Sequence, residues 1–234
     1  MALAGVDLQV EDEEILSVIG PNGSGKTTMF NCISGVYRPD QGQVLFQKQS
    51  LLGLSPDAVA QRGIARTFQN LRLFLHMTVL DNLLLGRHIK FRKNPFRAFL
   101  RMRSEELRHR EVVEEIIDFL EMEFIRDSIV GELGYGLRKR VDLGRALALE
   151  PEILIMDEPM AGMSVEEKED MARFIIDIQE YRRIPVILVE HDMEVVMDIS
   201  NRVAVLEWGH KIAEGSPADI RDNPKVINAY LGEE

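Results

Sequence analysis

The sequence predicts an α/β fold in which a parallel β-sheet is flanked by helices and interrupted by a helical insert. Short apolar runs recur along the chain and have the length of buried strands. A glycine-rich turn joins the first of these runs to a helical segment. Between about Thr78 and Phe124 the apolar residues take helical spacing instead. Strands that alternate with helices are typical of parallel sheets.

Length and composition indicate one folded globular domain and exclude several classes of protein. The 234 residues are 45% apolar and 29% charged, which is ordinary for a folded domain. The net charge of −11 argues against a general nucleic-acid binder, because neutralising phosphates needs clustered cations. No apolar run reaches the roughly 18 residues that span a bilayer, and no secretory signal pattern is present at the N-terminus. We therefore expect any membrane role to come through a partner.

The first part of the chain is predicted as strand, turn and helix. Residues 14–20 form the first strand, and a helix is expected from Lys26 to about Gly35, where glycine can end it. Two further strands are expected at residues 42–46 and 64–68.

The chain returns to alternating strands and helices after the insert. The expected helices are residues 163–181 and 193–199, and the expected strands are residues 153–156, 186–189 and 203–206. A turn is expected at Trp208-Gly209-His210.

The insert carries a basic stretch with interleaved aromatic residues, from Phe91 to Arg110. It could be a surface for anionic lipid headgroups or for a loop of a membrane partner. It could equally be a solvated helix face whose apolar residues turn inward, and we favour this second interpretation. Charge reversal at Arg97, Arg101 and Arg103 would discriminate the two: unchanged membrane association would support the solvated helix face.

A phosphate-binding loop is the strongest motif in the sequence. Eight residues after the first strand fit the pattern G-x-x-x-x-G-K-[ST]. Glycines let the backbone curl so that N–H groups point inward, and the following helix N-terminus favours an anion. Lys26 can reach the β- and γ-phosphates, and the Thr27 hydroxyl can bind Mg²⁺. We assign nucleotide binding to this loop and the next residue: Gly20, Pro21, Asn22, Gly23, Ser24, Gly25, Lys26, Thr27 and Thr28.

Two adjacent acids follow the strand at residues 153–156. A buried strand that ends in carboxylates delivers them to the crevice where ligands bind in open α/β sheets. Asp157 is the expected partner of Mg²⁺, and Glu158 can deprotonate the attacking water. Side by side, they indicate hydrolysis. Taken alone, the two acids could also be the first residues of an ordinary polar loop after the strand.

In their order along the chain, these motifs resemble the ATP-binding subunits of ABC transporters. Gln69, in Arg66-Thr67-Phe68-Gln69, resembles the glutamine loop of that family. Residues 133–137 resemble its signature, and His191 resembles its switch histidine. The resemblance implies a single ABC ATPase domain over residues 1–234. It has a P-loop NTPase (RecA-like) core at residues 1–70 and 150–234 and an inserted α-helical subdomain at residues 71–149. A partly truncated antiparallel β element is implied at the N-terminus.

The resemblance also implies a shared mechanism, in which two ATPase subunits sandwich two ATP molecules. This chain's own site would use Lys26, Thr27, Gln69, Asp157, Glu158 and His191, with Gln69 sensing Mg²⁺ or water. The signature residues Gly134, Tyr135 and Gly136 would face ATP held by the partner, which is a paralogue or a second copy. The other implied partners are integral-membrane permease subunits and, indirectly, a periplasmic solute-binding protein. The chain would then lie at the cytoplasmic face of the inner membrane.

A narrower resemblance is to importers of branched-chain and other hydrophobic amino acids, and to the first of their two paralogous ATPase subunits. It rests on the long helical insert and on four stretches: residues 66–74, 77–82, 157–163 and 229–232. The alternatives are an ATPase of another transport system, such as lipid or lipopolysaccharide export, and a soluble ABC ATPase outside transport. A non-hydrolysing regulatory module is a third, against which the acid pair argues.

The sequence departs from the family pattern at three places. Gly134 and Tyr135 replace a serine and a glycine of the signature, so one hydroxyl that could bind a γ-phosphate is missing. Ser164 stands where many relatives carry Asp or Asn, which leaves the coupling between the two sites open. No aromatic residue precedes Phe30, although the family stacks one on adenine. Either the start of the sequence is set too late, or the chain is shortened, or adenine is held differently, and we expect weaker ATP binding with poor base selectivity.

Overall fold

The predicted α/β fold is confirmed by a computed structural model. The structure describes residues 2–90 and 95–231, and only the backbone of residues 95–105 and 231. A six-stranded sheet has the order β4-β5-β6-β1-β7-β8. Its strands are β1 (Ile15–Ile19), β4 (Ile64–Arg66), β5 (Ile153–Asp157), β6 (Val186–Val189), β7 (Arg202–Glu207) and β8 (His210–Gly215).

The first five of these strands are parallel, and only β8 runs antiparallel, beside β7. Val186 of β6 aligns with Ile15 of β1 on one side and with Leu154 of β5 on the other. The carboxyl ends of these strands therefore lie at one edge of the sheet, where ligands bind in open α/β folds.

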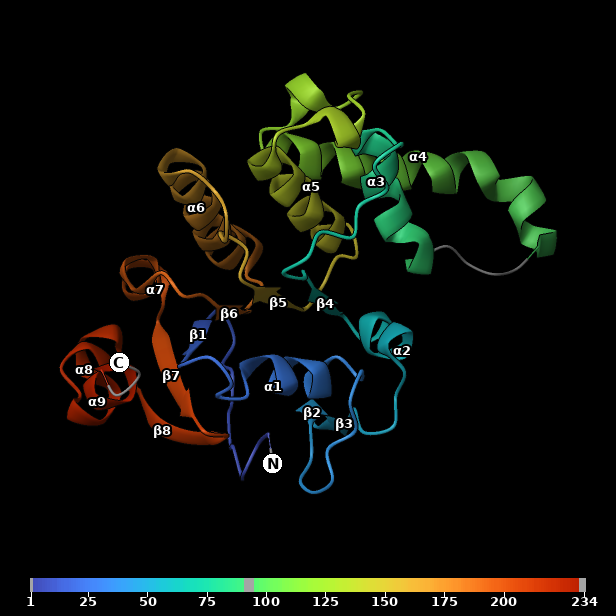
Figure 1. The fold of residues 1–234 in the computed structure, drawn as a ribbon. Coiled ribbons are helices and arrows are strands. Elements are labelled where there is room, and N and C mark those ends of the chain that lie inside the picture. The colour runs from blue at the N-terminus through green and yellow to red at the C-terminus, as the bar shows by residue number, and fades with distance from the viewer. Residues whose placement is uncertain (1, 91–94, 232–234) are drawn as a thin grey trace.

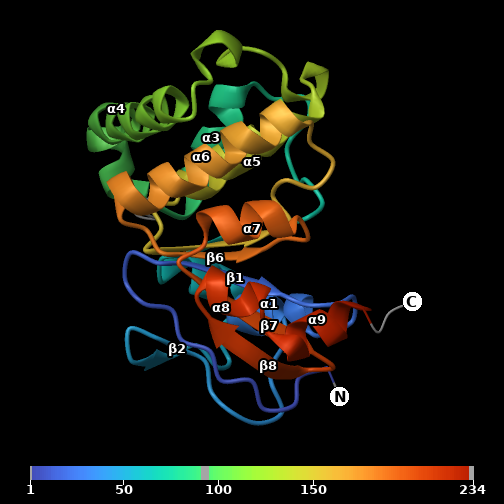
Figure 2. The ribbon, with the colours of Figure 1, turned by 90° about the vertical axis from the view of Figure 1, so that its left-hand side faces the viewer.

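Helices cover both faces of the sheet (Figure 1). One face carries α1 (Lys26–Ile33), the hairpin of β2 (Leu45–Phe46) and β3 (Gln49–Ser50), and, near the edge strand β4, α2 (Pro56–Gln61). The helical insert packs on the other face, together with the long helix that follows β5 (Figure 2). The insert contains α3 (Val79–Gly86), α4 (Pro95–Phe119) and α5 (Tyr135–Leu147), with the short 3₁₀ turns η1 (Arg87–Lys90), η2 (Glu123–Ile125) and η3 (Val130–Glu132). The long helix after β5 is α6 (Val165–Arg182).

The C-terminal part closes the β7–β8 side of the sheet with α8 (Pro217–Arg221) and α9 (Pro224–Leu231), and α7 (Met193–Ile199) precedes β7 (Figures 1 and 2). None of the described helices is long and apolar enough to cross a membrane.

Both faces of the central strands are buried, which explains their continuous apolar runs. On β5, Leu154 and Met156 belong to the core shared with the insert, whereas Ile153 and Ile155 belong to the core on the α1 side. This alternation follows from the two-residue period of a strand. Phe30 of α1 and Phe174 of α6 are fully buried in the two opposite cores.

Several predicted boundaries need correction. The strand expected at residues 42–46 is only Leu45–Phe46, because its partner in the hairpin is equally short. The strand expected at residues 64–68 ends at Arg66: the N–H of Thr67 still reaches Ile155 O (2.9 Å), but the N–H of Phe68 bonds the Asp142 carboxylate of α5 instead.

The helical region predicted from Thr78 to Phe124 is not continuous. Its first helix, α3, ends at Gly86, where an added Cβ would lie 2.7 Å from Arg145 O, so α3 packs tightly on α5. Five of the described helices and strands had no sequence prediction: β3, α2, β8, α8 and α9. The side chains proposed for the basic stretch, Phe91, Phe96, Phe99, Arg97, Arg101 and Arg103, lie outside the described residues.

Candidate active site

The phosphate-binding loop follows β1 and is shaped by two glycines. Gly20 has φ +146°, and a Cβ on it would lie 2.0 Å from Leu206 O of the neighbouring strand. Gly25 has φ +107°, and its Cβ would lie 2.5 Å from Ala2 O. L-residues with a side chain rarely adopt these conformations. The two positions therefore require glycine, as the motif predicts.

The loop leads into the N-terminus of α1, where no side chain caps the helix. The first N–H groups of a helix have no partner within the helix, and they carry the positive end of its dipole. Lys26 is buried, and its Nζ donates to the carbonyl oxygens of Gly20 (2.6 Å) and Pro21 (2.9 Å). The loop thus gathers amide donors and one ammonium group, which is the donor set that a polyphosphate requires.

Asp157, the last residue of β5, forms a buried ion pair with Arg66 at the end of β4. Arg66 Nη2 lies 2.8 Å from Asp157 Oδ2, and the two side chains are 6% and 8% exposed. Arg66 Nη1 also donates to Asn31 Oδ1 (2.9 Å) and Ser34 Oγ (3.2 Å) on α1. Arg66 was predicted only as part of a motif; its position as the partner of the first acid was missed.

Glu158, the second acid, meets two residues from distant parts of the chain. Gln69 Nε2 donates to Glu158 Oε2 at 2.7 Å, and His191 Nε2 lies 3.0 Å from Glu158 Oε1. Glu158 itself has a left-handed backbone with φ +50°. Such a conformation is costly for a residue with a side chain and clusters at functional sites. The structure therefore brings together the three residues that were predicted to act in catalysis.

A second buried carboxylate, Glu190, lies behind this group. Its Oε1 accepts the N–H of Met160 (2.7 Å) and its Oε2 accepts the N–H of His191 (3.2 Å). Burial raises the pKa of Glu190, although the two N–H groups lower it. Glu190 connects the loop after the acid pair to the loop of His191. Sequence reasoning missed it; an acid at the end of an apolar strand, before the histidine, was the available signal.

The three signature residues lie at the start of α5, in the helical layer on the opposite face of the sheet from α1 (Figure 1). Gly134 is the N-cap, and α5 begins at Tyr135, so the signature residues lie across the start of the helix. Tyr135 is 42% exposed. Ser164, the unusual residue after the acid pair, caps α6 in a capping box with Glu167. A Cβ on Gly136 would collide with Glu167 Oε1 (2.1 Å), so the start of α5 packs directly on this box.

The residues predicted for Mg²⁺ are an exposed hydroxyl, Thr27, an exposed amide, Gln69, and the buried carboxylate of Asp157. Within the described ranges, no three His, Cys, Asp or Glu side chains form a cluster that could hold a metal ion. The oxygens of this set are the hard ligands that Mg²⁺ accepts, and they are too few for a cage of protein atoms alone. This fits an ion bound by one or two protein groups, water and substrate phosphates.

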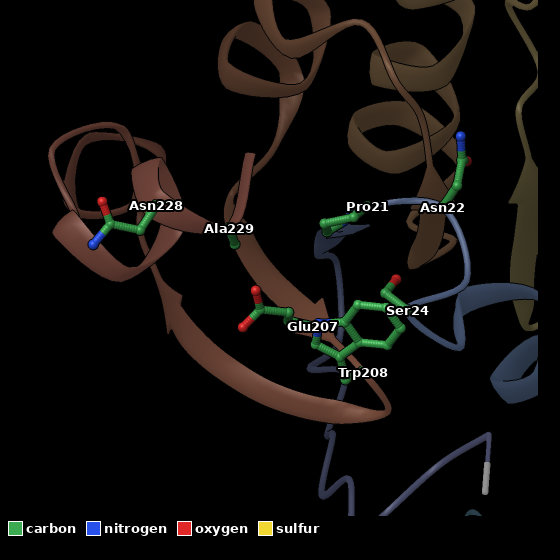
Figure 3. A pocket seen from close by; sticks show the side chains of 7 residues that line it. All are labelled: Pro21, Asn22, Ser24, Glu207, Trp208, Asn228 and Ala229. Carbon is green, nitrogen blue, oxygen red and sulfur yellow. The ribbon is translucent and has the colours of Figure 1, made fainter. Parts of the chain in front are cut away.

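A small cavity of about 90 Å³ adjoins the phosphate loop. Figure 3 shows the indole of Trp208 beside Ser24, with Pro21 and Asn22 of the loop above it. Trp208 is 79% exposed, and the N–H of the next residue, Gly209, donates to Ser24 O at 3.0 Å. The turn was predicted, but the placement of an aromatic ring next to the loop was not, because it depends on the pairing of β7 with β1.

Comparison with known proteins agrees with this geometry. Residues 3–161 match the ABC transporter family, and residues 210–234 match the branched-chain amino acid ATP-binding cassette transporter family. The high-affinity branched-chain amino acid transport ATP-binding protein BraF of Pseudomonas aeruginosa is 40% identical over all of this chain and 92% of its own length.

Two solved structures extend the likeness to the fold. A nucleotide-free ATP-binding cassette from an ABC transporter superposes with a TM-score of 0.85 at 32% identity, covering 99% of this chain and 93% of that one. A dimeric ATP-binding cassette in a post-hydrolysis state with ADP and Pi superposes with a TM-score of 0.78 at 28% identity, covering 92% and 90%. The chain belongs to the ABC transporter family as an ATP-binding cassette, and it is an ATPase.

Proposed function

We propose that this ATPase energises an importer of branched-chain or other hydrophobic amino acids. The support is the match of residues 210–234 to the cassette family of branched-chain amino acid transporters, together with the likeness to BraF over the full length of this chain. Co-purification with a permease, and uptake of labelled leucine compared with sulfate by vesicles that contain the complex, test the solute class. Uptake of neither solute class, by a complex that hydrolyses ATP, would direct the search to another transport system.

Within this function we assign catalysis to the group around Glu158. One observation carries the assignment: its carboxylate lies between Gln69 Nε2 and His191 Nε2, at the same edge of the sheet as the phosphate loop. A carboxylate in this position can hold a water molecule and accept its proton as the water attacks the γ-phosphorus. His191 and Gln69 fix the direction of the carboxylate, and His191 can contact the γ-phosphate.

Phosphate binding is assigned to the residues from Gly20 to Thr28. Lys26 would exchange its contacts with Gly20 O and Pro21 O for β- and γ-phosphate oxygens. Thr27, Gln69 and Asp157 would hold Mg²⁺, with Arg66 keeping Asp157 in place. When bound, Mg²⁺ neutralises charge that develops on the phosphate oxygens.

We assign residues 71–149 to a helical subdomain that presents the signature to a partner, and residues 1–70 and 150–234 to the nucleotide-binding core. Gly134, Tyr135 and Gly136 would contact ATP held by a second ATPase subunit. The dimeric state of a cassette similar to this chain supports that arrangement. The chain would reach the cytoplasmic face of the membrane through permease subunits, and a periplasmic solute-binding protein would deliver the solute.

Substitution of Glu158 by Gln tests the assignment. The amide keeps the shape of the side chain but cannot accept the proton, so the variant should bind ATP with unchanged affinity and lose steady-state hydrolysis. The assay needs the purified ATPase pair, with the sites of the partner silenced where the partner is a different chain. Hydrolysis at the wild-type rate would remove Glu158 from its role.

A further inference from the structure

One face of α5 holds the backbone of the segment that carries Gln69. Asp142 accepts the N–H of Phe68, and Arg145 donates to Arg72 O and pairs with Asp142 at 2.7 Å. One turn before Asp142, Lys139 Nζ donates to Gln69 O at 3.2 Å. The three side chains are spaced three residues apart along the helix, so they share one face. The signature helix is thereby attached to the segment of residues 68–72.

Lys139 makes a second contact that the rest of this face does not make. Its Nζ also donates to Glu158 O at 3.0 Å. Lys139 is only 4% exposed, and this burial lowers its pKa, while the charges of Asp142, Glu190, Glu158 and Asp157 act in the opposite direction. A buried ammonium group that bonds two carbonyl oxygens is costly to desolvate, and its placement calls for an explanation.

The carbonyl that Lys139 holds belongs to the strained residue of the site. Glu158 has φ +50°, a conformation that costs of order 1–3 kcal/mol unless its surroundings fix it. Its N–H donates to Val189 O at 2.9 Å, and its C=O accepts from Lys139. The peptide groups on both sides of the Glu158 Cα are therefore anchored, one by the sheet and the other by Lys139 of α5 together with a longer bond from the N–H of Ala161 (3.3 Å). Lys139 supplies the shorter and charge-assisted of these two bonds, and the only one that comes from α5.

The helix that supplies this anchor begins at the signature. Lys139 lies one turn after Tyr135, and its Nζ is 5.7 Å from the centroid of the Tyr135 ring. A displacement of the start of α5 therefore moves the ammonium group relative to Glu158 and Gln69.

We propose that Lys139 is a positioning residue that links the signature helix to Glu158, so that the direction of the catalytic carboxylate depends on the position of α5. The inference rests on the proposed role of Glu158 and adds a contact within one chain through which engagement of the signature by a partner reaches this chain's own site. Lys139 acts through the backbone of Glu158 and Gln69, not through contact with the nucleotide or the attacking water.

The test compares Lys139→Met, Lys139→Arg and wild type in the purified ATPase pair, with Mg-ATP as the substrate. Methionine fills the space with an apolar chain, and replacing a buried charge in this way is often neutral for stability. Loss of the two charge-assisted hydrogen bonds should lower kcat by roughly 10- to 100-fold. KM, and the affinity for ATP measured by calorimetry with Glu158→Gln in the background, should change less than about two-fold. Lys139→Arg, which keeps the charge, should recover part of kcat.

Arg140→Met is the matched control, because Arg140 is the next residue on the same helix. Its guanidinium contacts Asp170 Oδ2 (2.7 Å) and Leu120 O, away from Glu158. It should leave kcat within about two-fold of wild type.

Three outcomes would overturn the inference: wild-type kcat in Lys139→Met, a loss of kcat matched by an equal loss of ATP affinity, or an unfolded Lys139→Met protein, since the last two would make the role merely structural. Failure of the proposed function itself is recognised separately, by Glu158→Gln retaining hydrolysis.

Discussion

His191 Nε2 lies 3.0 Å from Glu158 Oε1, and this contact joins the loop after β6 to the residue that follows β5. The His191 side chain is 48% exposed, whereas the Glu158 side chain is 17% exposed, and Gln69, the other partner of Glu158, is exposed as well. His191 and Gln69 thus lie between the less exposed carboxylate and solvent. The orientation of the Glu158 carboxylate therefore depends on its contact with His191.

Substitution of His191 by Ala should therefore impair turnover much more than binding. The carboxylate loses one of its two side-chain partners, and a γ-phosphate loses a donor. Losses of about 10²-fold in kcat are typical when one preorganised donor is removed. We expect the affinity for ATP to stay within a few-fold of wild type. Steady-state kinetics with calorimetric binding checks both values. His76→Ala, at an exposed histidine in the helical insert, serves as the control and should have no effect.

The pair of Arg66 and Asp157 predicts a stability effect that depends on a second residue. Arg66→Met leaves the buried Asp157 carboxylate without its cation, and breaking a buried pair in this way costs about 3–5 kcal/mol. The free energy of unfolding, measured in urea with EDTA present, should fall by that amount. Adding Asp157→Asn to Arg66→Met should restore much of the loss, because the unpaired charge is gone.

Mg-ATP should also raise the melting temperature of Arg66→Met more than that of the wild type, since the bound cation supplies charge near Asp157. An equal destabilisation by Arg66→Met in the presence and absence of the Asp157 carboxylate would show that the ion pair is not its cause.

Local sequence patterns predicted the parts of the fold that depend on local physics. Val186–Val189 and Met193–Ile199 have the predicted bounds, because a short apolar run and a 3.6-residue period leave little choice. The glycines of the phosphate loop were predicted for the same reason: their backbone angles are available to few other residues.

Contacts between distant segments could not be predicted in this way. In the sequence, nothing distinguishes Lys139 from the other cations of its helix, because its contact with Glu158 O depends on how α5 packs in the fold. The sequence places Trp208 in a turn, but only the pairing of β7 with β1 places it beside Ser24. The edge strand β8 was missed because its residues are only partly buried and carry charges, so its apolar alternation is weak.

Trp208 should report nucleotide binding through its fluorescence. It is the only tryptophan of the chain, and its ring lines the cavity next to Ser24 of the phosphate loop. Phosphates that settle in the loop, or a base that stacks on the indole, would change the polarity around the ring. We expect a saturable change in intensity on titration with ATP. The same titration should give no change in Lys26→Ala, where phosphate binding is weakened.

The base dependence of that signal bears on how adenine is held. If the base stacks on Trp208, Trp208→Ala should weaken ATP binding by the roughly 1–3 kcal/mol that base–aromatic stacking contributes, and inorganic triphosphate should give a smaller fluorescence change than ATP. Equal signals from ATP and triphosphate would place the base elsewhere.

The pairing of Glu14 with Arg202 predicts a pH-dependent contribution to stability. Burial raises the pKa of Glu14, but hydrogen bonds from Arg202 Nε (2.7 Å) and Nη2 (2.9 Å), with the N–H of Glu11, outweigh it, so the pKa lies below its ordinary value. A carboxyl whose pKa is lower in the folded state stabilises the fold above its unfolded pKa of about 4.3, and this stabilisation is lost as the pH falls through the folded value. Glu14→Gln should therefore lower the free energy of unfolding by about 1.5–3 kcal/mol at pH 7, and by progressively less below pH 4.

Urea titrations across this pH range measure how the free energy of unfolding of wild type and Glu14→Gln changes with pH. Glu13→Gln is the control, because the side chains of Glu13 and Arg183 are 51% and 75% exposed and 3.5 Å apart. A loss of the same size at pH 3 and pH 7 would mean that Glu14 acts through packing and not through its charge.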